Sequence, residues 1–231
     1  MRIIARPSPN FNERAGGAVD ILLLHYTGMA SSEDALARLC DRDARVSAHY
    51  LIDEAGLIYQ LVAEEHRAWH AGVSFWAGER DINSRSIGIE LVNPGHDLGY
   101  RNFPLPQMQA LAVLCQQILA RHPITARRVL GHSDVAPGRK CDPGELFDWQ
   151  WLAAQGVGVW PDQVCFDAAA SPDILSLQQR LARYGYDIPQ TGIFGVRTRA
   201  VISAFQRHFR PADVSGAADA QTAAILQNLL T

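Results

Sequence analysis

The segment that most restricts the fold is a continuous apolar run, Ile21–Leu24, which ends directly at His25. A run without polar alternation is typical of a strand that is buried on both faces. The chain is therefore expected to build a sheet into the middle of its core and to bring a histidine to the end of a central strand.

The rest of the first 155 residues alternates between strand and helix patterns. Two β-rich runs around a glycine-containing turn predict a hairpin, and a serine before an acidic first turn predicts a helix start. The predicted segments are a helix after Ser31, strands at 48–52, 57–62, 86–92 and 129–132, and a helix at 106–121. This mixture predicts an α/β (α+β) domain whose mixed central sheet is flanked by helices.

The pattern changes in the last third of the chain. Residues 156–172 are small, contain Gly and Pro, and show little periodicity, which is typical of a linker. From residue 173 onward, amphipathic periodicity returns in three short stretches and predicts a small three-helix bundle. We therefore expect two domains, at 1–155 and 173–231.

Composition excludes several classes of protein. Lys and Arg total 21 against 24 Asp and Glu, which gives a net charge of −3 and argues against nucleic acid or an anionic membrane surface as the main partner. The longest apolar run, 18–24, is broken by Asp20 and is far shorter than the roughly 20 residues of a membrane span. Residues 1–7 lack the apolar core of a secretory signal. We expect a cytoplasmic monomer, or a periplasmic or cell-envelope protein if a leader was removed.

Two histidines at the ends of predicted strands and one carboxylate near the second of them suggest a metal site. His25 and His132 each follow a predicted strand, and Asp142 lies ten residues after His132. Two imidazoles and one carboxylate leave the fourth tetrahedral position of zinc open for water, as in catalytic rather than structural sites. Bound water then has a pKa of about 7 and can act as a nucleophile. Spacing alone also fits two hydrogen-bonded core histidines.

Six short motifs decide between these interpretations. They are LHYT at 24–27, SAHY at 47–50, AWHAG at 68–72, SIGIE at 86–90, GHSD at 131–134 and KCDPG at 140–144. With these motifs in this order, residues 18–152 resemble the zinc-dependent N-acetylmuramoyl-L-alanine amidases of the type 2 family, especially the AmpD- and AmiD-like branch. The resemblance implies that His25, His132 and Asp142 ligate one Zn²⁺ per chain. It also implies that Glu90 is the catalytic carboxylate and Lys140 the cation near the reacting carbonyl.

Elementary chemistry assigns the same roles. Glu90 stands in an apolar strand, where burial raises a carboxyl pKa and suits it to carry a proton from water to a leaving amine. Zinc and Lys140 would stabilise the oxyanion. Some family members use a cysteine directly before Pro-Gly as a ligand, but here that position is Asp142, and Cys141 comes one residue earlier. Adjacent side chains in extended backbone diverge, so only one is expected to reach the metal, and the register favours Asp142.

Three further residues are expected to bind substrate. Trp69 offers a flat face for a sugar or peptide, and His70 follows it in the same motif; His49 is the third. Packing in the core is the alternative for Trp69, and a buried hydrogen bond is the alternative for His49. Residues 173–230 resemble peptidoglycan-binding three-helix modules.

The sequence therefore predicts hydrolysis of the amide bond between N-acetylmuramic acid and L-alanine, in peptidoglycan or in muropeptides. The alternatives are a peptidoglycan-recognition protein that binds without cutting and a zinc peptidase of the stem peptide. If the C-terminal module only tethers the enzyme to the wall, a fragment that ends near Pro161 should still cleave a small soluble muropeptide.

Overall fold

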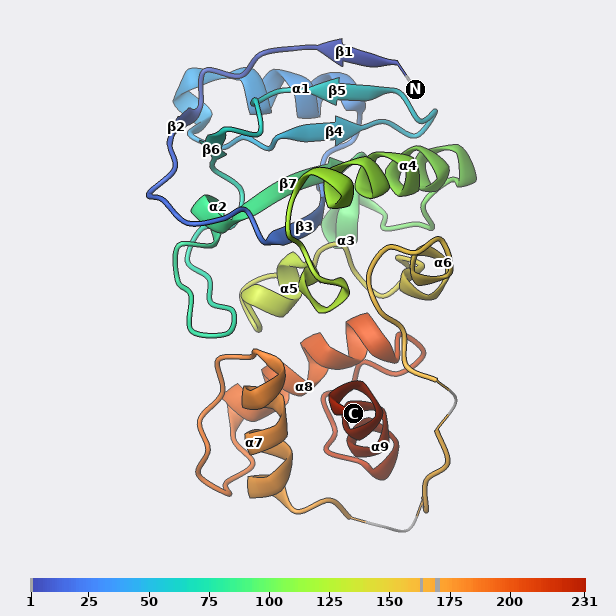
Figure 1. Cartoon of the computed structure of the whole chain (residues 1–231). Helices are drawn as coiled ribbons and strands as arrows, with labels where there is room; N and C mark the ends of the chain where they lie inside the picture. Colours follow the sequence, from blue (N-terminus) through green and yellow to red (C-terminus); the bar gives the residue numbers. More distant parts are fainter. Residues whose placement is uncertain (1, 163, 169–170) are drawn as a thin grey trace.

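A computed structural model describes residues 2–162, 164–168 and 171–231 and contains a six-stranded and a two-stranded sheet among helices (Figure 1). The large sheet has the strand order β1(Ile3–Ala5), β5(Ile58–Gln60), β4(Tyr50–Ile52), β7(Ser86–Leu91), β3(Ile21–Tyr26), β8(Val129–Gly131). The small sheet pairs β2(Phe11–Glu13) with β6(His66–Ala68). The β4–β5 pair is the predicted antiparallel hairpin, whereas β4, β7, β3 and β8 run parallel. The predicted mixed sheet is confirmed.

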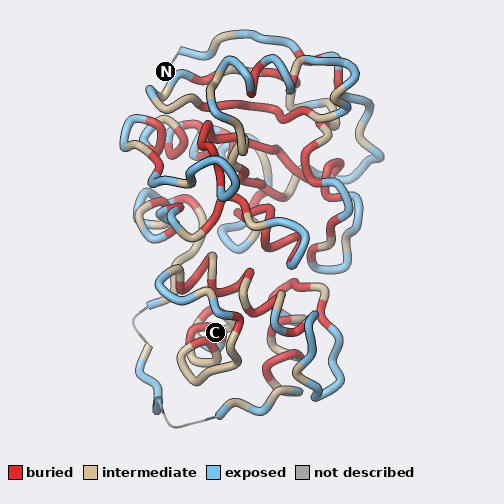
Figure 2. Tube along the Cα trace, turned by 180° about the vertical axis from the view of Figure 1, so that it is seen from behind, coloured by how far each residue is buried: buried red, intermediate tan, exposed pale blue. Residues whose placement is uncertain are grey.

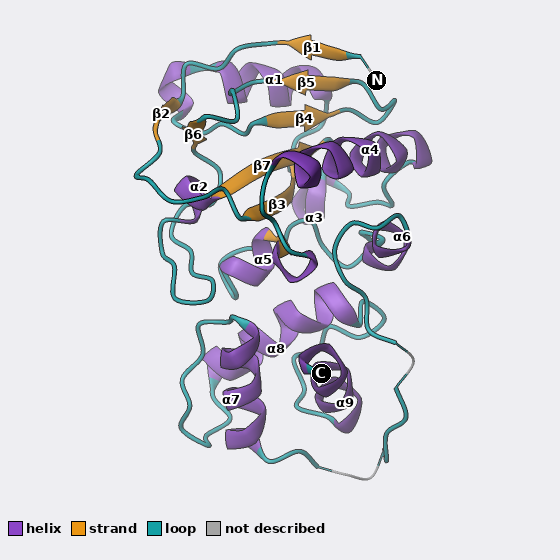
Figure 3. Cartoon of the chain, in the orientation of Figure 1, coloured by secondary structure: helices purple, strands orange, loops and turns teal. Residues whose placement is uncertain are grey.

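Helices surround the large sheet and form the C-terminal part of the chain (Figure 3). The α-helices are α1(Ser32–Cys40), α2(Ile82–Arg85), α3(Gly95–Leu98), α4(Leu105–Arg121), α5(His132–Val135), α6(Trp149–Ala154), α7(Ile174–Tyr184), α8(Val196–Phe209) and α9(Ala220–Leu230). Short 3₁₀ turns lie at η1(Arg42–Ala44) and η2(Ala126–Arg128). The Ser31 hydroxyl accepts a hydrogen bond from the backbone N–H of Asp34, so the predicted helix start at α1 is correct. Across the described residues, no helix is both long and apolar enough to cross a membrane.

Strand β3 is buried along Ile21–His25, as its sequence predicts, and Figure 2 shows buried segments running through the middle of the sheet domain. Leu22 and Leu24 belong to the core that also contains buried residues of α4. Ile21 and Leu23 belong to a second core on the opposite face. Because side chains alternate along a strand, His25 points to the same face as Ile21 and Leu23. This alternation places the histidine at the edge of the second core.

Helices α7, α8 and α9 form the predicted three-helix bundle, and their core continues into the sheet domain. Leu130 and Val135 pack in one cluster with Tyr186 and Phe205. The described residues of the predicted linker 156–172 form no helix or strand, and residues 163, 169 and 170 lie outside the described part. The bundle therefore packs directly against the sheet domain.

A buried carboxylate joins the two parts. Asp134 accepts hydrogen bonds from the backbone N–H of Gly131 at 2.8 Å, from the Tyr186 hydroxyl at 2.6 Å and from His208 Nδ1 at 2.7 Å. The His208 ring stacks on Trp149 with 3.7 Å between centroids. A fragment that ends near Pro161 would expose this apolar surface and leave Asp134 without two of its donors. The contact argues against a module that acts only as a tether.

We expect Tyr186→Phe to destabilise the whole protein. It removes the hydroxyl that donates to buried Asp134, and hydrogen bonds to charged groups contribute about 1.5–3 kcal/mol. The free energy of unfolding, measured by urea denaturation, should fall by about that amount in a single transition. Tyr184→Phe, in the same core, is the matched control. It should lower the free energy of unfolding by less, because the hydroxyl that donates to Asp134 belongs to Tyr186. Equal effects of the two substitutions would contradict the prediction.

Candidate metal centre

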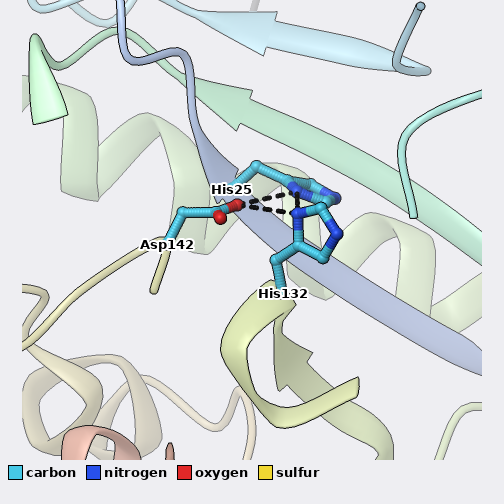
Figure 4. Close-up of side chains that lie close together, drawn as sticks. All are labelled: His25, His132 and Asp142. Atoms are coloured by element: carbon cyan, nitrogen blue, oxygen red, sulfur yellow. Dashed lines mark hydrogen bonds and ion pairs between the residues drawn. The ribbon is translucent and has the colours of Figure 1, made fainter. Parts of the chain in front are cut away.

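Three possible metal ligands meet at the carboxyl ends of the central strands (Figure 4). His25 lies near the end of β3, His132 is the first residue of α5 directly after β8, and Asp142 lies in the loop that follows α5. The two Nδ1 atoms are 3.0 Å apart, and each lies 3.0 Å from Asp142 Oδ2. Because β3 and β8 are parallel neighbours, their ends bring both histidines to one edge of the sheet.

The donor atoms of this cluster fit a metal ion. His132 Nε2 lies 2.9 Å from the carbonyl oxygen of Ala71, a closer partner than the Arg139 guanidinium at 3.3 Å. Because a carbonyl can only accept, this bond leaves the lone pair of the neutral ring on Nδ1. This lone pair faces Asp142 Oδ2, and an ionised carboxylate also only accepts. Two acceptors at 3.0 Å repel each other unless a cation lies between them. Zinc ligands lie about 2.0–2.2 Å from the ion, a distance that three atoms at this spacing can share.

Burial sets the protonation of these groups. Desolvation, with His132 as the second cause, lowers the pKa of His25 to about 4. Desolvation also lowers the pKa of His70, which lies beside His25, well below its usual value. Burial alone would raise the pKa of Asp142, but His132 and His25 together hold it well below its usual range. At neutral pH His25 therefore presents a neutral imidazole and Asp142 a carboxylate, the forms that bind metals.

Glu90 lies beside the cluster without belonging to it. It is the direct register partner of His25 across the β3–β7 pair. Its side chain is buried, and Oε2 has no hydrogen-bond partner among the described residues. Burial and then the Asp142 charge raise the Glu90 pKa well above its usual value, whereas Lys140 opposes the shift. An unpartnered carboxyl oxygen of high proton affinity next to a metal site is suited to accept a proton.

One cavity of about 410 Å³ brings the five predicted reactive residues together. Lys140 is exposed on its rim, in the loop between α5 and Asp142. The residues around this space include His25, Thr27, Met29, Leu39, His70, Glu90, His132, Arg139, Lys140 and Asp142. The predicted metal ligands, carboxylate and cation therefore share one open pocket.

Cys141 points away from the three ligand atoms. Its Sγ lies 3.2 Å from the Tyr26 hydroxyl and 3.5 Å from His96 Nδ1. Asp142, one residue later, contacts both histidines instead. The geometry therefore favours Asp142 as the third ligand, as the register against Pro143 predicts.

The three predicted substrate-binding residues lie in different places. Trp69 donates its indole N–H to Asn12 Oδ1 at 2.6 Å and borders a separate cavity beside Arg42. His49 is fully buried, and its Nδ1 accepts the backbone N–H of Gly88. His70 borders the main cavity, but the residue is only 7% exposed and its ring contacts His25. Substrate binding by these residues stays a prediction.

Two charged residues of this region, the half-buried Arg14 and the buried Asp134, are missed by the sequence analysis. Arg14 donates to the carbonyls of Asn83, Ser84 and Ser86 and lies 3.0 Å from His49 Nε2. Asp134 anchors the C-terminal helices two residues after His132. A charged residue in a loop or a short helix is usually solvated, so its local pattern gives no sign of burial.

Comparison with known families gives two matches. Residues 15–145 match the family model of N-acetylmuramoyl-L-alanine amidases, and residues 170–226 match that of peptidoglycan binding domains. The chain is 43% identical to the N-acetylmuramoyl-L-alanine amidase AmiD of Escherichia coli (strain K12), over 92% of this chain and 82% of that protein.

Solved structures show the same similarity over both parts of the chain. One is a complex of AmiD from E. coli with the substrate anhydro-N-acetylmuramic acid-L-Ala-D-γ-Glu-L-Lys, with 40% identity and a TM-score of 0.83. It covers 95% of this chain and 91% of that one. Another is AMPDH3 from Pseudomonas aeruginosa in complex with an anhydromuramic pentapeptide, with 35% identity and a TM-score of 0.82. It covers 95% of both chains.

Proposed function

The chain belongs to the N-acetylmuramoyl-L-alanine amidase family, and we propose that it hydrolyses the amide between N-acetylmuramic acid and L-alanine with one zinc ion. The observation that carries the proposal is the juxtaposition of Glu90 with the triangle of His25, His132 and Asp142 in one cavity. A protein that only recognises peptidoglycan has no need for this set of groups, which disfavours that alternative.

The residues that line the cavity have separate roles in the proposed reaction. His25, His132 and Asp142 would hold zinc, which would act as a Lewis acid that activates water and polarises the carbonyl. Glu90 takes a proton from the attacking water and delivers it to the nitrogen of L-alanine as the C–N bond breaks. Lys140, on the rim, stabilises the negative charge that develops on the carbonyl oxygen. The products are a lactyl carboxylate and a free amino terminus.

We propose anhydromuropeptides as one substrate class, because both similar structures hold such molecules. The C-terminal helices, which match peptidoglycan binding domains, support polymeric wall as a second class. We propose that the protein acts as a monomer in the cytoplasm on soluble fragments; the alternative is the periplasm or cell envelope, where it would meet polymeric wall. Sedimentation analysis and cell fractionation test these two points.

Mass spectrometry of the products from one defined muropeptide tests the reaction. We expect two products, the muramic acid moiety with a free lactyl carboxylate and the intact stem peptide that begins with L-alanine. The same peptide without its sugar should stay uncut. Cleavage inside the stem peptide would instead identify a zinc peptidase, and binding without any product would identify a recognition protein.

A further inference from the structure

A line of hydrogen bonds behind the metal cluster fixes the proton positions of two histidines. The Ser86 hydroxyl donates to the carbonyl of Ile82 at 2.6 Å, and a carbonyl can only accept. The single hydroxyl hydrogen is thereby used, so the Ser86 oxygen can only accept from His70 Nε2, 3.4 Å away. In the neutral ring, His70 then carries its proton on Nε2 and a lone pair on Nδ1.

The same reasoning fixes the proton position of His25, one of the proposed metal ligands. His70 Nδ1 lies 3.0 Å from His25 Nε2, so His25 must donate its Nε2 proton there. His25 Nδ1 is then left with a lone pair, and this is the atom that faces His132 and Asp142. The opposite tautomer of His70 would place two protons between the rings or force the His25 proton onto the atom that has to bind metal.

The fold holds the His70 ring firmly in this place. The backbone N–H groups of His70 and Ala71 both donate to the side-chain oxygen of Asn83, at 3.0 and 2.8 Å. The ring packs over Gly88, where a Cβ would lie 2.6 Å from three ring atoms, so this position in β7 accepts only glycine. The adjoining Ala71 carbonyl orients His132. Residues 70 and 71 therefore orient both imidazole ligands.

We propose that His70 is a positioning residue, which sets the tautomer of His25 through the Ser86–His70–His25 line and thereby prepares its Nδ1 for metal. The identity of the metal as zinc rests on the proposed function. The role itself concerns the metal-free protein and requires no turnover. Groups that orient a metal-bound histidine typically contribute 10–100-fold to metal affinity.

Two variants of His70 separate positioning from packing. His70→Asn keeps an acceptor oxygen near the place of Nδ1, whereas His70→Ala removes the acceptor. Zn²⁺ affinity is measured by competition with a chromophoric chelator, and long-range ¹H–¹⁵N spectra of the metal-free protein report the His25 tautomer. We expect His70→Ala to weaken Zn²⁺ binding about 10–100-fold and to mix the His25 tautomers. We expect His70→Asn to restore most of both properties.

His122→Ala is the matched control, because that imidazole bonds Glu64 at 2.6 Å and makes no contact with the cluster. It should leave zinc affinity and the His25 tautomer unchanged. If His70→Ala fails to fold, Ser86→Ala provides the same test, since it frees His70 to take the other tautomer. A folded His70→Ala or Ser86→Ala protein with unaltered His25 tautomer and zinc affinity would overturn the proposal. Both readouts are independent of substrate, so loss of amidase activity alone would leave the proposal intact.

Discussion

Removing the metal should abolish hydrolysis, and adding Zn²⁺ should restore it. Without a cation, the lone pairs of His25 Nδ1, His132 Nδ1 and Asp142 Oδ2 face one another at 3.0 Å, and their repulsion drives the three groups apart. A catalytic metal supplies several kcal/mol of charge stabilisation, so the loss should reach about three orders of magnitude or more. Product formation from a defined muropeptide, together with elemental analysis of the same sample, measures the effect.

Two controls accompany this experiment. Phenanthroline should inhibit, whereas its positional isomer that cannot chelate should not. His25→Ala should lose the metal, and His122→Ala, which removes an imidazole bonded to Glu64, should keep it. Full turnover by a sample that elemental analysis finds free of metal would refute the assignment.

The central part of the fold could be predicted because its signals are local. The apolar run at Ile21–Leu24 is typical of a strand buried on both faces, and Ser31 before an acidic turn marks the start of α1. Strands such as β1, β2 and β6 have three residues each. Three residues are too few to reveal an alternation of apolar and polar side chains. Their positions depend on pairing with distant segments.

The candidate site likewise contains residues that local sequence patterns identify and contacts that they do not. The meeting of His25, His132, Glu90 and Asp142 around one cavity could be predicted because strand ends and motifs identify these residues, and their roles stay predictions. The contact of His70 with His25 spans 45 positions, and the contact of Asp134 with His208 spans 74. Such contacts depend on how loops cross the sheet, which no local pattern encodes. The packing of the C-terminal helices against the sheet domain escaped prediction for the same reason.

Glu90→Gln should retain zinc and fold yet lose most of its catalytic rate. The amide has the shape of the carboxyl but cannot accept a proton from water, and Glu90 is not one of the three ligands. General acid–base groups contribute about 10²–10⁴-fold, so kcat should fall by that factor, or about 2.7–5.5 kcal/mol in activation free energy. Because the interaction is made in the transition state, kcat and kcat/KM should fall together.

Glu145→Gln is the matched control for this loss. Glu145 is a half-buried carboxylate near the same loop, where it pairs with His96 and Arg207 rather than with the cavity. Its replacement should change kcat by no more than about twofold, since surface ion pairs contribute little. Zinc content by elemental analysis must match in both variants, so that a lost metal is not mistaken for a lost base. A Glu90→Gln protein with full zinc and near-normal kcat would place the proton carrier elsewhere. Because His49 is buried against Gly88, a different group on the cavity wall would then have to serve.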